Sequence, residues 1–221
     1  TVINARRIAG YNDARGQVNW YVQAAEELAR VRLGQLAELN ETGINRYVPG
    51  LGTELSFPID GGLIKAQIDD ASNCFNLNSL AGATSDGDEG SAATQTVDAY
   101  TFYVELLKAM GIGPNEAERL ASTAADWVDV DSDLRAFGAE AGFYASALKP
   151  RSVANTRMIS DRELLDVSGY TPEIYRQIAP FVCARPDTDV GKFNINTMDA
   201  RQAPLMAAIF TGQIATDVMI G

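Results

Sequence analysis

The sequence predicts an α+β fold, in which a long N-terminal helix and a small antiparallel sheet accompany a large inserted all-α domain. Three observations support this prediction: apolar residues at helical spacing from about 17 to 39, a β-hairpin pattern over 55–68, and more than 100 residues of mainly helical pattern before a short strand at 193–197. A helical block between two β segments is typical of an insertion. We therefore expect three parts, residues 1–75, 76–190 and 191–221.

The first helix is predicted over Gln17–Leu39, because apolar residues recur there near the helical period and only Arg32 interrupts the stripe. Gly43 then supplies a stop signal. The ordinary use of such a stripe is to pack the helix on its own domain. The stripe consists of Val18, Tyr21, Val22, Ala25, Leu28, Ala29, Leu36 and Leu39.

A β-hairpin is predicted next. Leu55, Phe57 and Ile59 alternate with other residues, and residues 60–62 (DGG) are typical of a tight turn. The second strand returns over Leu63–Ile68. After the hairpin, residues 81–95 are small, polar and acidic, which indicates a loop whose charges are solvated. A second cation site among Asp86, Asp88 and Glu89 is a weaker alternative.

Glycine and proline divide the helical block into elements. A helix over about 95–110 ends at Gly111, and Pro114 is well placed as the first residue of a helix to about Val128. Ser160 and Glu163 form a capping-box pattern before a short helix through Val167. The last expected elements are a helix from Pro172 to about Ala179, a strand over 193–197, and a helix from about Met198 that Pro204 kinks or splits.

The composition excludes several classes of site. The chain of 221 residues contains no histidine, which removes histidine-dependent nucleophilic catalysis and zinc–histidine sites. The formal net charge of −11 argues against a nucleic-acid or anionic-membrane partner. Cys74 and Cys183 form either one disulfide or two independent buried thiols, and the sequence leaves both open. The chain begins at Thr1 without methionine, directly in a helical pattern, as expected after removal of an upstream segment.

The acidic loop, residues 126–140, predicts a calcium site. Asp129, Asp131, Asp133 and Glu140 stand at relative positions 1, 3, 5 and 12, where an EF-hand loop supplies oxygen ligands, and Asp126 adds a fifth carboxylate. Position 6 is not glycine, so the loop is not an EF-hand. Two alternatives are a solvated acidic loop and a paired-carboxylate hydrolase. Gly138, which permits a turn before Glu140, favours calcium, and Trp127 is expected in the core.

Helix pairs joined by glycine turns, around Gly111 and Gly169, also resemble helix-hairpin-helix modules, which offer turn amides to DNA phosphates. A nucleic-acid-binding protein is therefore the alternative function. The expected basic stripe is missing, so compact packing is the preferred role of these pairs. The basic residues of the region are scattered: Arg119, Arg135, Lys149, Arg151 and Arg157.

Several segments, taken in order, resemble the type II secretion protein K family of minor pseudopilins. Together they cover most of residues 15–210, and the combination is far more specific than any single match. The segments are 68–80 (IDDASNCFNLNSL), 111–120 (GIGPNEAERL), 125–131 (ADWVDVD), 138–144 (GAEAGFY), 155–165, 178–182 (IAPFV) and 194–197 (NINT).

The resemblance implies a pseudopilin-like α+β domain with a large inserted helical domain that contains helical-hairpin, SAM-like units. It also implies a non-enzymatic assembly and capping protein at the tip of the periplasmic pseudopilus, bound to minor pseudopilins I and J. A hydrophobic N-terminal helix outside this chain would anchor it in the inner membrane. Exported proteins are a further candidate partner. Family members bind calcium in the helical domain, which implies that role for Asp129, Asp131, Asp133 and Glu140, and for Asp126.

Overall fold

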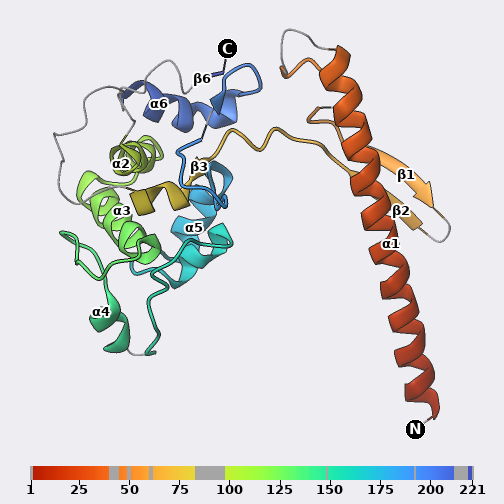
Figure 1. Ribbon diagram of the computed structural model, residues 1–221, viewed down its shortest axis with the longest axis horizontal. Helices are drawn as coiled ribbons and strands as arrows, with labels where there is room; N and C mark the ends of the chain where they lie inside the picture. Colours follow the sequence, from red (N-terminus) through yellow and green to blue (C-terminus); the bar gives the residue numbers. More distant parts are fainter. Residues whose placement is uncertain are drawn as a thin grey trace. The chain divides into compact units, whose positions relative to one another are not determined.

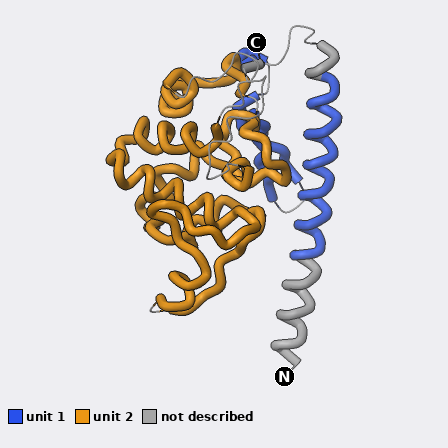
Figure 2. Tube along the Cα trace, turned by 60° about the vertical axis from the view of Figure 1, so that its left-hand side comes forward, with its two compact units in different colours: residues 1–70 blue, residues 71–221 orange. Residues whose placement is uncertain are grey.

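The computed structural model describes residues 2–39, 45–48, 51–59, 62–82, 98–147, 149–191, 193–211 and 219–220. The chain forms two compact units, residues 1–70 and 71–221 (Figure 2). These units differ from the three expected parts in two ways. The division falls before Cys74 rather than after residue 75, and residues 193–211 belong to the second unit. The physical reason is packing, because the last helix lies against the first helix of that unit.

Unit 1 contains one long helix and a hairpin. Helix α1 spans Val2–Leu39 and so begins well before the predicted Gln17 (Figure 1). Strands β1 (Leu55–Ile59) and β2 (Gly62–Ala66) pair antiparallel as predicted, with Ile59 opposite Gly62. The second strand ends before the predicted Ile68, which instead forms an isolated parallel bridge with Leu51. The expected turn residues 60–61 and the stop at Gly43 lie outside the described residues.

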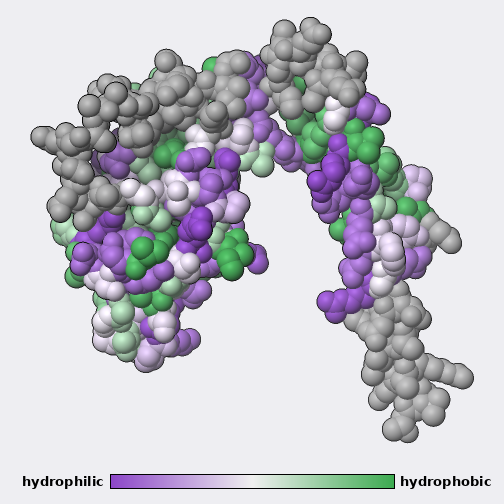
Figure 3. Space-filling view, in the orientation of Figure 1, coloured by the Kyte–Doolittle hydropathy of each residue, from purple (hydrophilic) through white to green (hydrophobic). Residues whose placement is uncertain are grey.

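Helix α1 buries little of its predicted apolar stripe. Tyr21, Ala25 and Ala29, which are four residues apart, are half-buried, and the helix contacts β2. Val18 and Val22 belong to the same stripe and are 56% and 60% exposed. The expectation that the stripe packs on its own domain therefore holds only for its centre. Apolar surface stays exposed on unit 1 (Figure 3). The side chains of Leu36 and Leu39 lie outside the described part of the chain.

Unit 2 is mainly helical (Figure 1). Its most extensive packing joins α2 (Ala99–Ala109) to α3 (Pro114–Val128) and to α6 (Ala203–Thr211), and α3 to η1 (Leu77–Gly82). Two short parallel strand pairs, β3 with β4 and β5 with β6, join distant parts of the chain. In chain order the elements are β3 (Phe75–Asn76), η1 (Leu77–Gly82), α2 (Ala99–Ala109), α3 (Pro114–Val128), α4 (Ala141–Ala145), η2 (Asp161–Asp166), α5 (Pro172–Ile178), η3 (Ala179–Phe181), β4 (Val182–Cys183), β5 (Phe193–Asn194), η4 (Ala200–Gln202), α6 (Ala203–Thr211) and β6 (Met219–Ile220).

Local sequence signals explain several of the element boundaries. The Asp98 side chain accepts hydrogen bonds from two backbone N–H groups and starts α2, while Pro114 is the first residue of α3, as predicted. Gly111 has φ +86°, which the turn between these helices requires. The Ser160 capping box forms, but it opens a 3₁₀ helix. Pro204 lies at the start of α6, directly after the η4 turn.

Aromatic side chains form the centre of unit 2. Phe75 stacks on Phe102 and Tyr103, with ring centroids 5.3 and 4.9 Å apart, and Phe102 in turn stacks on Phe193. All four are fully buried, and burying one such side chain contributes about 1.5–3 kcal/mol. Trp127 is also in the core, as predicted, and meets the Tyr144 ring edge-on. The core therefore joins β3, α2, α3 and β5 into one body.

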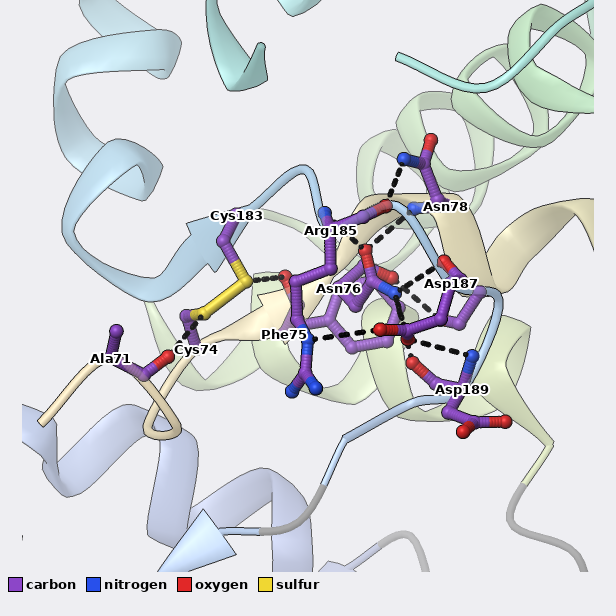
Figure 4. The surroundings of a disulfide bond; sticks show 10 residues. Ala71, Cys74, Phe75, Asn76, Asn78, Cys183, Arg185, Asp187 and Asp189 are labelled. Carbon is purple, nitrogen blue, oxygen red and sulfur yellow. Dashed lines mark hydrogen bonds and ion pairs between the residues drawn. A yellow bond between two sulfur atoms is a disulfide. The ribbon is translucent and has the colours of Figure 1, made fainter. Parts of the chain in front are cut away.

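A disulfide and a set of buried asparagines connect the start of unit 2 to its later segments (Figure 4). Cys74 and Cys183 are bonded, which resolves the alternative that the sequence leaves open, and the bond joins residues 109 apart. Beside it, Asn76 donates from its side-chain amide to the carbonyls of Asp187 and Asp189. The amide oxygen of Asn76 accepts from the N–H groups of Asn78 and Arg185.

Two neighbouring asparagines repeat this arrangement. Asn78 bonds both the N–H and the C=O of Met158, and Asn73 bonds both the N–H and the C=O of Asn194. The three asparagines are buried, and their side-chain atoms all have hydrogen-bond partners. We call Asn73, Asn76 and Asn78 the asparagine clamp. With the disulfide, it fixes the first strand of unit 2 against three later segments.

Candidate metal centre

The acidic loop begins in the last turn of α3 and ends at the start of α4. Asp126 lies within α3, Asp129 caps its C-terminus, and Glu140 caps the N-terminus of α4. These three carboxylates are buried, with 0%, 4% and 8% of each residue exposed. Asp131 and Asp133 lie between them and are exposed. The structure therefore divides the predicted ligands into an inner group of three and an outer group of two.

Each inner carboxylate has an oxygen that is buried and accepts no hydrogen bond: Oδ1 of Asp126, Oδ1 of Asp129 and Oε1 of Glu140. The second carboxylate oxygens of Asp126 and Glu140 each accept a hydrogen bond. Oδ2 of Asp126 accepts the backbone N–H of Arg135 at 3.4 Å, and Oε2 of Glu140 accepts the N–H of Ala141 at 3.2 Å. A buried acceptor without a partner costs about 1–3 kcal/mol, and more when it is charged. Three such atoms in one loop indicate that a positively charged partner belongs there.

Arg135 supplies part of that positive charge. Its Nε lies 3.5 Å from Oδ1 of Asp126 and 3.8 Å from Oδ2 of Asp129, and its side chain is 13% exposed. These contacts are longer than the roughly 2.7–2.9 Å of a good charge-assisted hydrogen bond. Nε of Arg135 thus faces two buried carboxylates at distances longer than those of a close hydrogen bond.

The electrostatics of the loop disfavour full ionisation. Burial raises the pKa of Asp126 to about 6 and that of Asp129 to about 7, and the nearby charges of Asp131 and Asp126 contribute to the latter shift. Burial also raises the pKa of Glu140, as do the charges of Asp131 and Asp133. Burial, with a smaller contribution from neighbouring negative charges, therefore disfavours the ionised form of the three inner carboxylates, and a divalent cation would offset this.

The outer part of the loop contacts a residue that the sequence did not identify, Asn155. Asp131 accepts the N–H of Asp133 on its side chain, and its carbonyl accepts from Nδ2 of Asn155 at 2.6 Å. The amide oxygen of Asn155 is buried and accepts no hydrogen bond, and its backbone has φ 42°. Amide oxygens are calcium ligands of the same class as carboxylates. A single asparagine far along the chain from the acidic loop carries no signal in the sequence.

Gly138 has a different role from the predicted one. The left-handed residue of the turn is Phe137, with φ 65°, and not the glycine. A Cβ added to Gly138 would stand 2.8 Å from Cγ of Asp126 and closer still to its Oδ2. Glycine is therefore required because the buried carboxylate of Asp126 packs directly on the backbone at this point.

The donor set fits a hard cation such as calcium, because it consists of carboxylate and amide oxygens, without histidine or thiol. The fit is incomplete. Within the described ranges, no three acidic or cysteine side chains converge closely enough to form a ready metal cluster. The electrostatic coupling among the carboxylates and the buried, unpartnered oxygens nevertheless place the five residues in one neighbourhood.

A long helix with a small antiparallel hairpin, joined in sequence to a large helical unit, defines a pseudopilin-like α+β protein. The solved structures include a close likeness. It is a chain of the crystal structure of the GspK-GspI-GspJ complex from the enterotoxigenic Escherichia coli type 2 secretion system, with a TM-score of 0.75 and 27% sequence identity. The match covers 90% of this chain and 68% of that one. No helix among the described residues is long and apolar enough to span a bilayer.

The sequence comparisons agree with the structural one. The family model for type II secretion system protein K matches residues 73–187. Type II secretion system protein K of Pectobacterium carotovorum is 35% identical over 209 residues, and that of Aeromonas hydrophila 32% identical over 212 residues. The chain belongs to the type II secretion system protein K family. The matches cover 91% and 96% of this chain, but only 60% and 64% of the two relatives.

Proposed function

We propose that the chain is part of a minor pseudopilin that assembles with minor pseudopilins I and J at the tip of a type II secretion pseudopilus. The observation that carries the proposal is the exposed apolar surface of α1, in a chain similar to one found in a complex with GspI and GspJ. Its role is assembly and capping rather than catalysis. In the whole protein, an N-terminal hydrophobic helix would anchor this periplasmic part in the inner membrane.

Helix α1 offers two apolar faces to partners. Val18, Val22 and Leu33 lie on one face, next to the half-buried centre of the stripe. Trp20 and Val31 are eleven residues apart, about three helical turns, and therefore share the opposite face, where they are 75% and 53% exposed. Exposed apolar faces of this kind mark interaction surfaces. Two faces on one helix suit a bundle with two partner helices.

Calcium bound by the acidic loop would have a structural role in this function, because it would stabilise unit 2. The inner carboxylates of Asp126, Asp129 and Glu140 would hold the ion, and Asp131 and Asp133 would close the loop over it. Bound calcium would offset the repulsion among the five side chains and join the end of α3 to the start of α4. The nucleic-acid alternative gains no support, because the chain carries a net charge of −11 and scattered basic residues.

Mixing experiments with the I and J proteins of the same genome test the proposal. We expect one 1:1:1 complex in size-exclusion chromatography with light scattering. Trp20→Glu/Val31→Glu is expected to lose one partner and Val18→Glu/Val22→Glu the other, because each pair places charge on one face. Gln23→Glu, on the polar side of α1, is the matched control and keeps both. A wild-type chain that stays monomeric with folded I and J would contradict the proposal.

A further inference from the structure

Among the described residues, the basic residue that forms ion pairs with the inner carboxylates is Arg135. Its Nε contacts Asp126 at 3.5 Å and Asp129 at 3.8 Å. The same residue also holds the loop through its backbone, because its N–H donates to Asp126 and its C=O accepts from Gly138. A single guanidinium therefore lies against the two carboxylates that the loop buries most completely.

The position of Arg135 conflicts with a bound divalent cation. The ion would have to approach Oδ1 of Asp126, which Nε now faces at 3.5 Å. It would also have to approach the unpartnered Oδ1 of Asp129, on the same carboxylate whose Oδ2 lies 3.8 Å from Nε. Two positive charges within a few ångströms repel strongly in a buried site, so the guanidinium and the ion cannot share the space. The side chain has a route out, since Leu134, Ala136 and Phe137 around it are exposed.

We propose that Arg135 is a built-in counter-ion that competes with the divalent cation for Asp126 and Asp129, and so sets the affinity of the site. The inference rests on the calcium site proposed above. Without metal, Arg135 holds the loop together by offsetting part of the charge on the buried carboxylates. When the metal binds, the guanidinium leaves toward solvent, and the cost of its departure is subtracted from the binding free energy.

Replacing Arg135 by methionine tests the competition. R135M removes the charge and keeps a side chain of comparable length. Its calcium dissociation constant, measured by titration calorimetry after metal removal, is expected to be about tenfold lower than that of the wild type. Its melting temperature in chelator is expected to fall by about 5 °C, because the buried carboxylates lose their counter-ion. R176M is the matched control, because it removes an exposed charge from α5; its dissociation constant is expected within about twofold of the wild type.

The outcomes separate this inference from the site on which it rests. If the wild type binds calcium and R135M binds it equally or more weakly, Arg135 supports the ligands and the competition is wrong. If neither binds calcium at millimolar concentration, both the site and the competition fail. Should R135M not fold in chelator, R135K serves instead. Its shorter ammonium spans both carboxylates less well, so we expect calcium binding a few-fold tighter than wild type, and unchanged or weaker binding would overturn the inference.

Discussion

Unit 2 contains two junctions between segments of the chain, one built from neutral groups and the other from carboxylates. The asparagine clamp and the disulfide join the first strand to later segments with neutral groups. In the clamp, every side-chain donor and acceptor has a partner. The acidic loop joins α3 to α4 with buried carboxylates, of which Asp126, Asp129 and Glu140 each leave one oxygen without a hydrogen bond. The first junction is complete in the protein alone, and the second is not.

The difference shows that a buried polar junction needs both hydrogen-bond donors and acceptors if the chain alone is to satisfy all of its polar groups. An amide carries both donors and an acceptor, so Asn76 and Asn78 can each bond N–H and C=O groups of a facing segment. An ionised carboxylate only accepts, and apart from Arg135 its charged neighbours in the loop are also carboxylates. In the proposed calcium site, a cation from outside the chain would supply what the loop lacks, whereas the side-chain atoms of the clamp already have their partners. The predictions below perturb one junction or the other.

The largest effect is expected at the disulfide. Cys74→Ser/Cys183→Ser opens a loop between residues 109 apart, and the chain-entropy model predicts a loss of about 4 kcal/mol in the free energy of unfolding. Urea denaturation measures the change. Wild type treated with a reductant is the control and should match the variant. A loss below about 1 kcal/mol would mean that the clamp alone fixes this junction.

The clamp itself comes next. Asn76→Ala removes the partners of two carbonyls and two N–H groups in a fully buried place, and we expect a loss of about 3 kcal/mol. Asn196→Ala changes the same residue type at an exposed position, where the loss should stay within about 0.5 kcal/mol. Equal losses in the two variants would refute the view that the clamp holds the segments together.

Gly138→Ala perturbs the acidic loop. The new Cβ would collide with the carboxylate of Asp126, so we expect a loss of about 2 kcal/mol and weaker calcium binding. Gly142→Ala is the matched control in the same loop region, since nothing lies within 4 Å of its added Cβ. In α4 that change should stabilise by up to about 1 kcal/mol. Unfolding curves of both variants decide whether Asp126 truly packs on Gly138.

The smallest effect concerns pH in the absence of metal. Asp126 and Asp129 have pKa values of about 6 and about 7 in the folded protein, above the ordinary 3.8. The folded state therefore binds protons more tightly than the unfolded state, and stability falls as pH rises from about 4 to about 7. Between pH 6 and 7.5 in chelator we expect a loss of about 1 kcal/mol, which Asp129→Asn should reduce. Stability that rises over this range would contradict the raised pKa values.

Local signals in the sequence predicted much of the fold. The start of α3 at Pro114, the Ser160 capping box and the two-stranded hairpin depend on neighbouring residues and all form. The second hairpin strand, however, ends at Ala66 instead of Ile68, and the capping box opens a 3₁₀ helix. Helix α4 was missed because it has only five residues, one of them glycine. The sequence shows a helical pattern from Thr1, but the amphipathic helix is predicted only from Gln17, whereas α1 begins at Val2.

The candidate site was predictable only in part. The carboxylates were visible as a spacing in the sequence, and their role as calcium ligands stays a prediction. The places of Arg135 and Asn155 were not visible, because both depend on contacts made after the chain has folded. The pairing of Cys74 with Cys183 likewise required the parallel contact of β3 with β4. Sequence spacing identifies a charged loop, but not which of its groups are buried or what faces them.

The central claim, that the acidic loop is completed by a cation, is tested most directly by thermal unfolding of metal-free protein in calcium and in chelator. At calcium concentrations about 100 times the dissociation constant, the gain is about 2.7 kcal/mol, or a rise of roughly 5–10 °C in melting temperature. The rise should vanish in Asp126→Asn/Asp129→Asn. Equal melting temperatures of the wild type in calcium and in chelator would show that the loop is only a solvated acidic segment.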